Sequence, residues 1–146
     1  MSTHISLSQL GWSPFFQQQL SLEEWDECFP ARVVARHRST VDLISSDLIF
    51  KQQTFSLLIT DKLSELTVGD WILMSIEETG NPEFFRMLER VSKFSRKAAG
   101  TKIEEQLIAA NIDTAFIVCS LNHDFNLNRI ERYLALVHEA GAEPVI

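Results

Sequence analysis

Positive charge is missing from the start of the sequence, where Arg32 is the first lysine or arginine. A secretory signal begins with a basic segment, so this absence argues against export. No stretch reaches the roughly 18 uninterrupted apolar residues that a membrane-spanning helix requires, and no lipidation motif is found. These absences predict a cytoplasmic protein that does not associate with a membrane.

Cysteine and glycine are also scarce. Cys28 and Cys119 are far apart and lack the close spacing of a zinc knuckle, so we expect both to be reduced and mostly buried. None of the five glycines is followed by Lys-Ser or Lys-Thr, so the chain has no P-loop to hold nucleotide phosphates. Neither a zinc-protease motif nor a nucleophile elbow occurs. The 146 residues are therefore predicted to bind no nucleotide, to hold no metal and to be inactive as a hydrolase.

The net charge of −7 hides a strong segregation of the charged residues. Residues 1–29 hold four acidic side chains, whereas residues 86–102 hold six basic side chains and one acidic one. Residues 30–60 form a second, weaker basic segment. Two basic segments in an acidic chain are what a local phosphate-binding face requires. The alternative is a solvated surface that acidic neighbours balance in space.

The residue pattern divides the chain into four segments. Residues 1–29 are read as a leader with a short helix that begins at Ser13-Pro14, because a serine cap and a proline at the first helical position favour a helix start. Its aromatic side chains are too many for a free tail, so the leader is expected to pack on the domain that follows. Residues 30–92 are read as a barrel, 93–106 as a basic linker and 107–146 as the start of an α/β domain.

Five short runs of β-branched and aromatic residues occupy the barrel segment. They are separated by turn residues such as those at 68–70 and 80–82. Five strands in about sixty residues fit a small closed barrel. The OB-fold is the leading prediction, and an SH3-like barrel is the alternative. The strands are expected at residues 31–38, 41–44, 54–60, 70–76 and 84–91.

Alternation along the strands suggests where RNA would bind. Side chains on a strand alternate between faces, so Arg32, Arg36 and Arg38 are expected on one face, and Arg86 and Arg90 on one face of the fifth strand. OB-folds hold nucleic acid with cationic and aromatic side chains. The predicted RNA-binding residues are Arg32, Arg36, His37, Arg38, Arg86, Arg90, Lys93, Arg96 and Lys97.

His37 and Phe84 each have a second interpretation. His37 has no second histidine near it in the sequence, and one isolated histidine supports neither a metal site nor acid–base chemistry. The alternative is a loop histidine without a special role. Phe84 is either a stacking platform or a part of the core.

The last segment has the pattern of an α/β domain. Residues 114–119 form a continuous apolar run, which is typical of a strand covered on both faces of a parallel sheet. Asn126 and Gly141 are placed to begin and end a helix, and residues 144–146 begin a second apolar strand. We expect the domain to continue beyond Ile146 in a longer protein.

Several short motifs in residues 30–146 resemble the ribosome small subunit-dependent GTPase A family of circularly permuted GTPases. They occur in the order of that family and at plausible spacings. Residues 30–38 resemble the start of its OB-fold. The other matching segments are residues 88–90, 94–100, 105–106, 108–114, 116–118, 120–122, 124–127 and 129–134.

The resemblance implies an OB-fold, a GTPase domain whose guanine-specificity motif precedes its P-loop, and a C-terminal zinc-binding domain. It also implies GTP, Mg²⁺ and Zn²⁺ for the full-length protein, and the small ribosomal subunit with its rRNA as its partner. We expect the protein to be a monomer. No nucleotide or metal residue of the family can be carried onto this chain. The rRNA contact of the OB-fold is carried onto Arg36, His37, Arg38 and their loop.

Two other functions remain open at this point. The chain is either the RNA-docking front of a GTP hydrolase that acts in small-subunit maturation or a stand-alone OB-fold RNA-binding protein. The α/β pattern of residues 107–146 favours the first. In a third interpretation, the barrel is a protein-interaction module whose basic residues are incidental.

Overall fold

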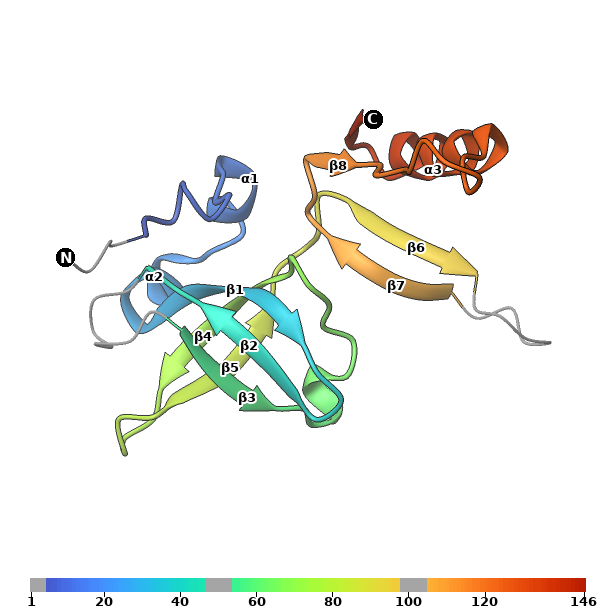
Figure 1. The fold of residues 1–146 in the computed structure, drawn as a ribbon. Helices are drawn as coiled ribbons and strands as arrows, with labels where there is room; N and C mark the ends of the chain where they lie inside the picture. Colours follow the sequence, from blue (N-terminus) through green and yellow to red (C-terminus); the bar gives the residue numbers. More distant parts are fainter. Residues whose placement is uncertain (1–4, 47–53, 98–104) are drawn as a thin grey trace. The chain divides into compact units, whose positions relative to one another are not determined.

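The computed structural model describes residues 5–46, 54–97 and 105–146 (Figure 1). The chain forms two compact units, Met1–Val91 and Ser92–Ile146. Each unit is built around its own strands. No helix in the described part of the chain has both the length and the apolar character to cross a lipid bilayer.

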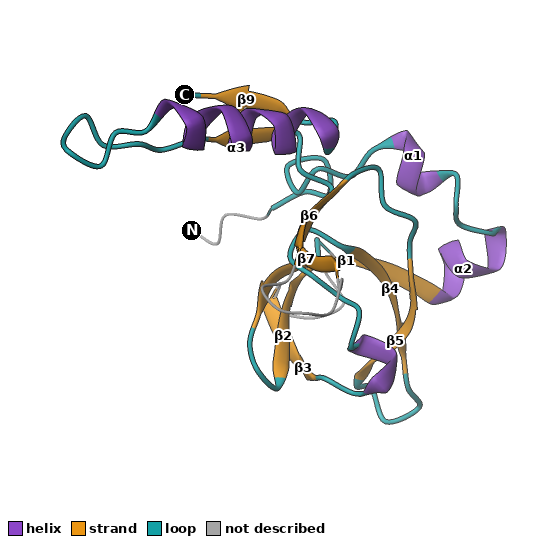
Figure 2. Ribbon diagram, turned by 90° about the vertical axis from the view of Figure 1, so that its right-hand side faces the viewer, coloured by secondary structure: helices purple, strands orange, loops and turns teal. Residues whose placement is uncertain are grey.

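A five-stranded antiparallel sheet forms the body of the first unit. Its strand order is β3-β2-β1-β4-β5, so that β1 lies at the centre and β3 and β5 lie at the edges. The sheet curls around its own core, as the end-on view shows (Figure 2). This order and curvature confirm the predicted OB-fold over the SH3-like alternative. The strands are β1 Cys28–Arg36, β2 Thr40–Ile44, β3 Thr54–Leu58, β4 Trp71–Ile76 and β5 Pro82–Met87.

Alternating side chains of these strands fill the inner core. Val41, Leu43 and Ile72 are fully buried there, and Leu63 joins them from the short 3-10 helix η1, Asp61–Leu63. Phe84 packs against the same cluster, so its reading as a core residue is confirmed. Burying such side chains stabilises the fold by about 1.5–3 kcal/mol each.

A β-bulge in β1 interrupts the alternation that the sequence suggested. The pairing with β2 shifts between Val33 and Ala35, so Arg32 lies opposite Ile44 whereas Arg36 lies opposite Val41. Val41 belongs to the inner core, so Arg36 has moved to the other face of the sheet from Arg32. The expectation that these arginines share one face is therefore wrong, because an extra residue in one strand reverses the direction of every side chain after it.

The leader covers the outer face of the sheet, as expected. Its first helix is α1, Pro14–Gln17. Phe16 from this helix packs with Trp71 and Leu73 of β4 and with Leu88, which follows β5. Trp12 meets the Trp71 ring edge-on at a centroid distance of 4.9 Å.

A second helix, α2 at Leu22–Glu27, was not predicted. It begins with a capping box in which Ser21 and Glu24 bond each other's backbone amides. The pattern Ser-x-x-Glu in the sequence is the local signal that could have located it.

The second unit begins with a hairpin where a linker was expected. Strand β6, Lys93–Lys97, pairs antiparallel with β7, Glu105–Ala110. Cross-strand backbone bonds thus order residues that composition alone suggested were a connector. Lys102, which belongs to the same basic segment of the sequence, lies outside the described residues.

The rest of the second unit is a parallel β-α-β arrangement, as predicted. Strand β8, Thr114–Phe116, pairs in parallel with β9, Glu143–Val145. Helix α3, Leu127–Glu139, connects them and is capped by the Asn126 side chain. Gly141 adopts a φ of 77° just after the helix, a left-handed conformation that glycine tolerates best.

Only one face of this parallel pair is covered within the described residues. Ile117, Val137 and Ala142 form a small core between α3 and the strands. Phe116 and Val118 point away from that core and are 75% and 92% exposed. Cys119 is exposed rather than buried, so its expected burial is wrong: it follows the end of β8 and has no covering layer. Cys28 is half-buried, and burial raises the pKa of its thiol.

Candidate RNA-binding surface

The β1–β2 turn, residues 37–39, carries Arg38, an exposed positive charge of the first unit. The His37 N–H donates to the Thr40 carbonyl at 2.8 Å, and the Ile59 N–H donates to the Ser39 carbonyl at 2.8 Å. These bonds join the turn to the first residue of β2 and to the residue that follows β3. Arg38 at its tip is exposed and has no ion pair or hydrogen bond to any residue that the structure describes. Its guanidinium is therefore available for a ligand.

His37 points back to the sheet beside this turn. Its Nε2 lies 2.8 Å from Oδ2 of Asp42, and the Ser56 hydroxyl donates to the other carboxylate oxygen at 2.6 Å. The bond from Ser56 and then the bond from His37 lower the pKa of Asp42 below its ordinary value. The carboxylate stays ionised and fixes the imidazole next to Arg38.

Arg36, at the base of the turn, forms hydrogen bonds within the first unit. Its guanidinium donates to the carbonyls of Ser64, at 3.0 Å, and of Leu66. Both carbonyls follow η1, so Arg36 ties β1 to the loop that leads to β4. The contact positions the turn and uses donors that would otherwise reach a phosphate.

Arg32 lies under the leader. It donates to the carbonyl of Leu10, and its guanidinium carbon lies 5.7 Å from the centroid of the Trp71 ring. A cation over an indole face is attracted by the ring quadrupole. Arg32 thus helps to hold the leader against the sheet.

Arg86 makes a similar attachment to α2. It donates to the two carboxylate oxygens of Glu24, at 2.6 and 3.0 Å, and to the carbonyl of Gln19 at 2.8 Å. Mainly through the bond from Arg86, with help from the Ser21 N–H, the pKa of Glu24 falls to about 2. The Gln19 side chain also exchanges hydrogen bonds with the backbone of Glu89. These bonds fasten the end of the leader to β5 and the residues after it.

Arg90 forms the most buried ion pair in the described residues. It donates to both oxygens of Asp70, at 2.7 and 2.8 Å, and to the Glu65 carbonyl at 3.0 Å. The Asp70 side chain is 0% exposed and also accepts from the Thr67 N–H at 2.8 Å. The hydrogen bond to Asp70 raises the pKa of Arg90.

The remaining predicted cations lie in β6. Arg96 is exposed and donates to the Gln106 side chain of β7 at 3.1 Å. Lys93 is exposed at the start of the strand. Lys97 ends the strand, and its side chain lies outside the described part of the structure.

Sequence reasoning missed the partners of the arginines. Gln19, Glu24 and Asp70 determine how Arg86 and Arg90 are used, yet they are separated from them by 20 to 67 residues. The capping box at Ser21 signalled the position of Glu24, but no local pattern signals the pairing across the sheet.

No group of three metal-ligating side chains comes together in residues 5–46, 54–97 or 105–146. A pocket of about 220 Å³ lies between the end of β8 and the start of α3, where Ser120, Asn126 and Arg129 are among the residues that line it. Its polar groups include no nucleotide-binding motif.

Comparison with known proteins reveals close relatives. A small ribosomal subunit biogenesis GTPase, RsgA 2 of Vibrio parahaemolyticus serotype O3:K6, is 56% identical over all 146 residues of this chain and 38% of its own length. RsgA of Streptomyces coelicolor is 34% identical over 99% of the chain and 39% of the relative. The chain thus spans less than two fifths of these relatives.

Solved structures share the fold at low identity. The crystal structure of YloQ, a circularly permuted GTPase, matches with a TM-score of 0.56 and 16% identity over 82% of this chain and 39% of that one. YjeQ from Thermotoga maritima matches with a TM-score of 0.53 and 18% identity over 80% of this chain and 39% of that one. The profile of the RsgA GTPase family matches residues 87–146. The chain therefore belongs to the RsgA GTPase family.

Proposed function

We propose that this chain is the RNA-docking part of a GTPase that hydrolyses GTP during maturation of the small ribosomal subunit, and that it works as a monomer in the cytoplasm. Relatives that carry the name small ribosomal subunit biogenesis GTPase support the process. The observation that carries the docking role is the β1–β2 turn, where Arg38 is exposed and uncommitted. Loops between the strands of OB-folds are ordinary places for binding nucleic acid.

The nine predicted cations divide into two groups by their contacts. Arg32, Arg36, Arg86 and Arg90 bond carbonyls or carboxylates of the first unit, so their role in this proposal is to position the leader, the turn and the loops. The direct phosphate contacts are assigned to the remaining residues, which belong to the turn and to β6. These are His37, Arg38, Lys93, Arg96 and Lys97.

Hydrolysis itself is assigned to the part of the relatives' length that this chain does not span. The P-loop that would hold GTP and Mg²⁺ is absent from the sequence. Zn²⁺, likewise, is assigned to residues outside this chain. The chain alone is accordingly proposed to be inactive. A stand-alone RNA-binding protein is a weaker proposal, because the parallel β8–α3–β9 arrangement is part of an α/β domain and not of an OB-fold.

Binding to small-subunit rRNA in a salt series tests the docking role. An acidic chain has no general attraction for RNA, so affinity must come from local cations and must fall as salt rises. Arg38→Ala should weaken binding and reduce the magnitude of the log–log salt slope by about 0.7–0.9. Lys62→Ala removes a charge from η1, outside the proposed contacts, and is the matched control. Unchanged affinity and slope for Arg38→Ala would remove the turn from the binding surface.

A further inference from the structure

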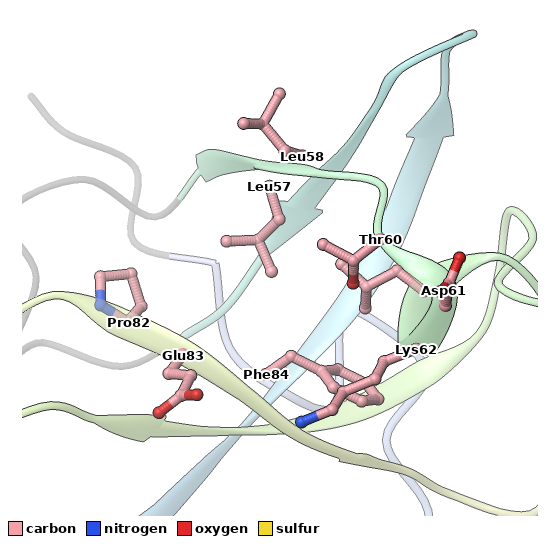
Figure 3. A pocket seen from close by; sticks show the side chains of 9 residues that line it. Leu57, Leu58, Thr60, Asp61, Lys62, Pro82, Glu83 and Phe84 are labelled. Carbon is pink, nitrogen blue, oxygen red and sulfur yellow. The ribbon is translucent and has the colours of Figure 1, made fainter.

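A groove of about 520 Å³ separates β3 from β5, the two edge strands of the barrel. Figure 3 shows side chains from both strands and from η1 around it. The apolar part of its lining includes Leu57, Leu63 and Phe84, which also pack in or against the inner core. Asp61, Lys62 and Glu83 supply the charged part. The groove is thus an opening in the wall of the barrel that reaches its core.

Both walls of the groove offer backbone hydrogen bonds. In the described residues, no strand pairs with the outer edge of β3 or of β5. An edge strand presents a row of N–H and C=O groups that another extended chain can use. A segment lying in the groove would extend the sheet by strand addition, a recurrent mode of peptide recognition.

Two exposed apolar side chains flank the same opening. Leu58 at the end of β3 is 72% exposed, and Phe85 in β5 is 51% exposed. Leu58 follows the core residue Leu57 and so points outward, whereas Phe85 is the extra residue of a β-bulge in β5 and is exposed there. Isolated exposed apolar residues are common. Here, however, a strand between β3 and β5 would cover both of them.

The charges around the groove indicate which kind of segment fits. Asp61, Lys62 and Glu83 form no ion pair with any residue in the described ranges, and two of the three are acidic. Glu83 lies opposite Ser75 on the outer face of β5, and Phe85, the extra residue of a β-bulge between Phe84 and Arg86, is exposed two positions further along. A lysine or arginine on the outer face of an added strand would meet Glu83 with its charge and Phe85 with its stem. An RNA phosphate would instead be repelled by the two acids.

We propose that the groove between β3 and β5 binds an extended segment of a basic partner protein as an additional strand. Apolar side chains of the segment point inward onto Leu57 and Phe84, and alternate basic side chains point outward toward Glu83. This protein-binding site uses other residues than the proposed RNA contacts on the β1–β2 turn and β6.

A synthetic peptide of alternating valine and lysine, about six residues long so that it spans roughly 20 Å, is the probe. It is added to the whole chain, and amide hydrogen exchange is followed residue by residue by NMR. We expect exchange in β3, β5 or both to slow by about tenfold or more at saturation. A peptide N-methylated at alternate positions, or one with glutamate in place of lysine, should bind at least about tenfold more weakly.

Outward-facing variants test the site without disturbing the core. Leu58→Asn and Phe85→Asn should each lower the affinity of the chain for the valine–lysine peptide several-fold. Val34→Asn is the matched control, because Val34 is an exposed apolar residue in the central strand β1. Binding that leaves exchange in β3 and β5 unchanged, or equal affinity for the glutamate peptide, would overturn the proposal. It would also be overturned if these amides became protected with rising protein concentration alone, since the occupant would then be a second copy of the chain.

Discussion

The two units differ in how their sheets are covered. The sheet of the first unit has a core on its inner face and the leader on its outer face. The parallel pair β8–β9 of the second unit has α3 on one side, whereas Phe116 and Val118 on the other side are exposed. Strands of parallel sheets ordinarily receive cover on both faces. Within the described residues, the sheet of the first unit is therefore covered on both faces, whereas the parallel pair of the second unit is covered on one.

The arginines extend this comparison. Four arginines of the first unit bond to its own carbonyls and carboxylates, and these bonds join segments far apart in the sequence. In the second unit, by contrast, Arg96 of β6 is exposed and donates to the uncharged side chain of Gln106. Positive charge thus contributes to the tertiary structure of one unit and remains at the surface of the other.

The largest expected effect comes from breaking the buried ion pair of the first unit. Asp70→Asn leaves the partly buried charge of Arg90 without its partner, and such changes cost about 3–5 kcal/mol. We expect the free energy of unfolding, measured with urea, to fall by about 3 kcal/mol. Asp61→Asn, at an exposed aspartate, should stay within about 0.5 kcal/mol of wild type. Similar losses for both variants would show that the Asp70–Arg90 pair does not stabilise the unit.

Hydrogen exchange sharpens the comparison between the units. Exchange follows local opening. The opening free energy of amides in β1 and β4 should therefore be higher than that of amides in β8 and β9 by about 2 kcal/mol or more. The measurement is native-state exchange in a dilute sample, repeated at a lower protein concentration to exclude self-association. Equal protection in both regions would contradict the interpretation that the second unit is less completely covered.

A smaller effect is expected where α2 is attached to the sheet. The folded-state pKa of Glu24, about 2, lies below the ordinary value of 4.5. Its contribution to stability is therefore complete above about pH 4.5 and is lost as the pH falls toward 2. Glu24→Gln should cost about 1 kcal/mol at pH 7, since the pair is partly solvated.

The same variant tests the sign of this pH dependence. The difference in unfolding free energy between wild type and Glu24→Gln should shrink as the pH falls from 4.5 to 2. A difference that stays constant over this range would show that the carboxylate of Glu24 is not the group responsible.

The smallest effect on stability is expected at the β1–β2 turn. Arg38 makes no bond within the described residues, so Arg38→Ala should change the free energy of unfolding by less than about 0.5 kcal/mol. Arg36→Ala should cost more, about 1–2 kcal/mol, because it leaves the carbonyls of Ser64 and Leu66 without their donor. Thermal unfolding of the two variants side by side provides the check. Equal losses would mean that the turn does not depend on Arg36.

Much of the fold could be predicted because its signals are local. The five strands of the barrel follow from short β-branched and aromatic runs between turn residues. The helix from Leu127 follows from the cap at Asn126 and the glycine at position 141. The absence of a P-loop follows from five glycine positions alone. In each case the residues that give the signal lie within one element or beside it.

The use of the positive charges could be decided only by the tertiary structure. One extra residue in β1 separates Arg32 from Arg36, although the sequence places both at positions of the same parity. Chain folding brings Glu24 to Arg86 and Asp70 to Arg90 across the sheet. A local pattern records which side chains an element carries. Whether an arginine meets a carboxylate or solvent depends on distant segments. The sequence therefore could not show that Arg38, among the barrel's predicted RNA-binding arginines, is the one without a bond to the described residues.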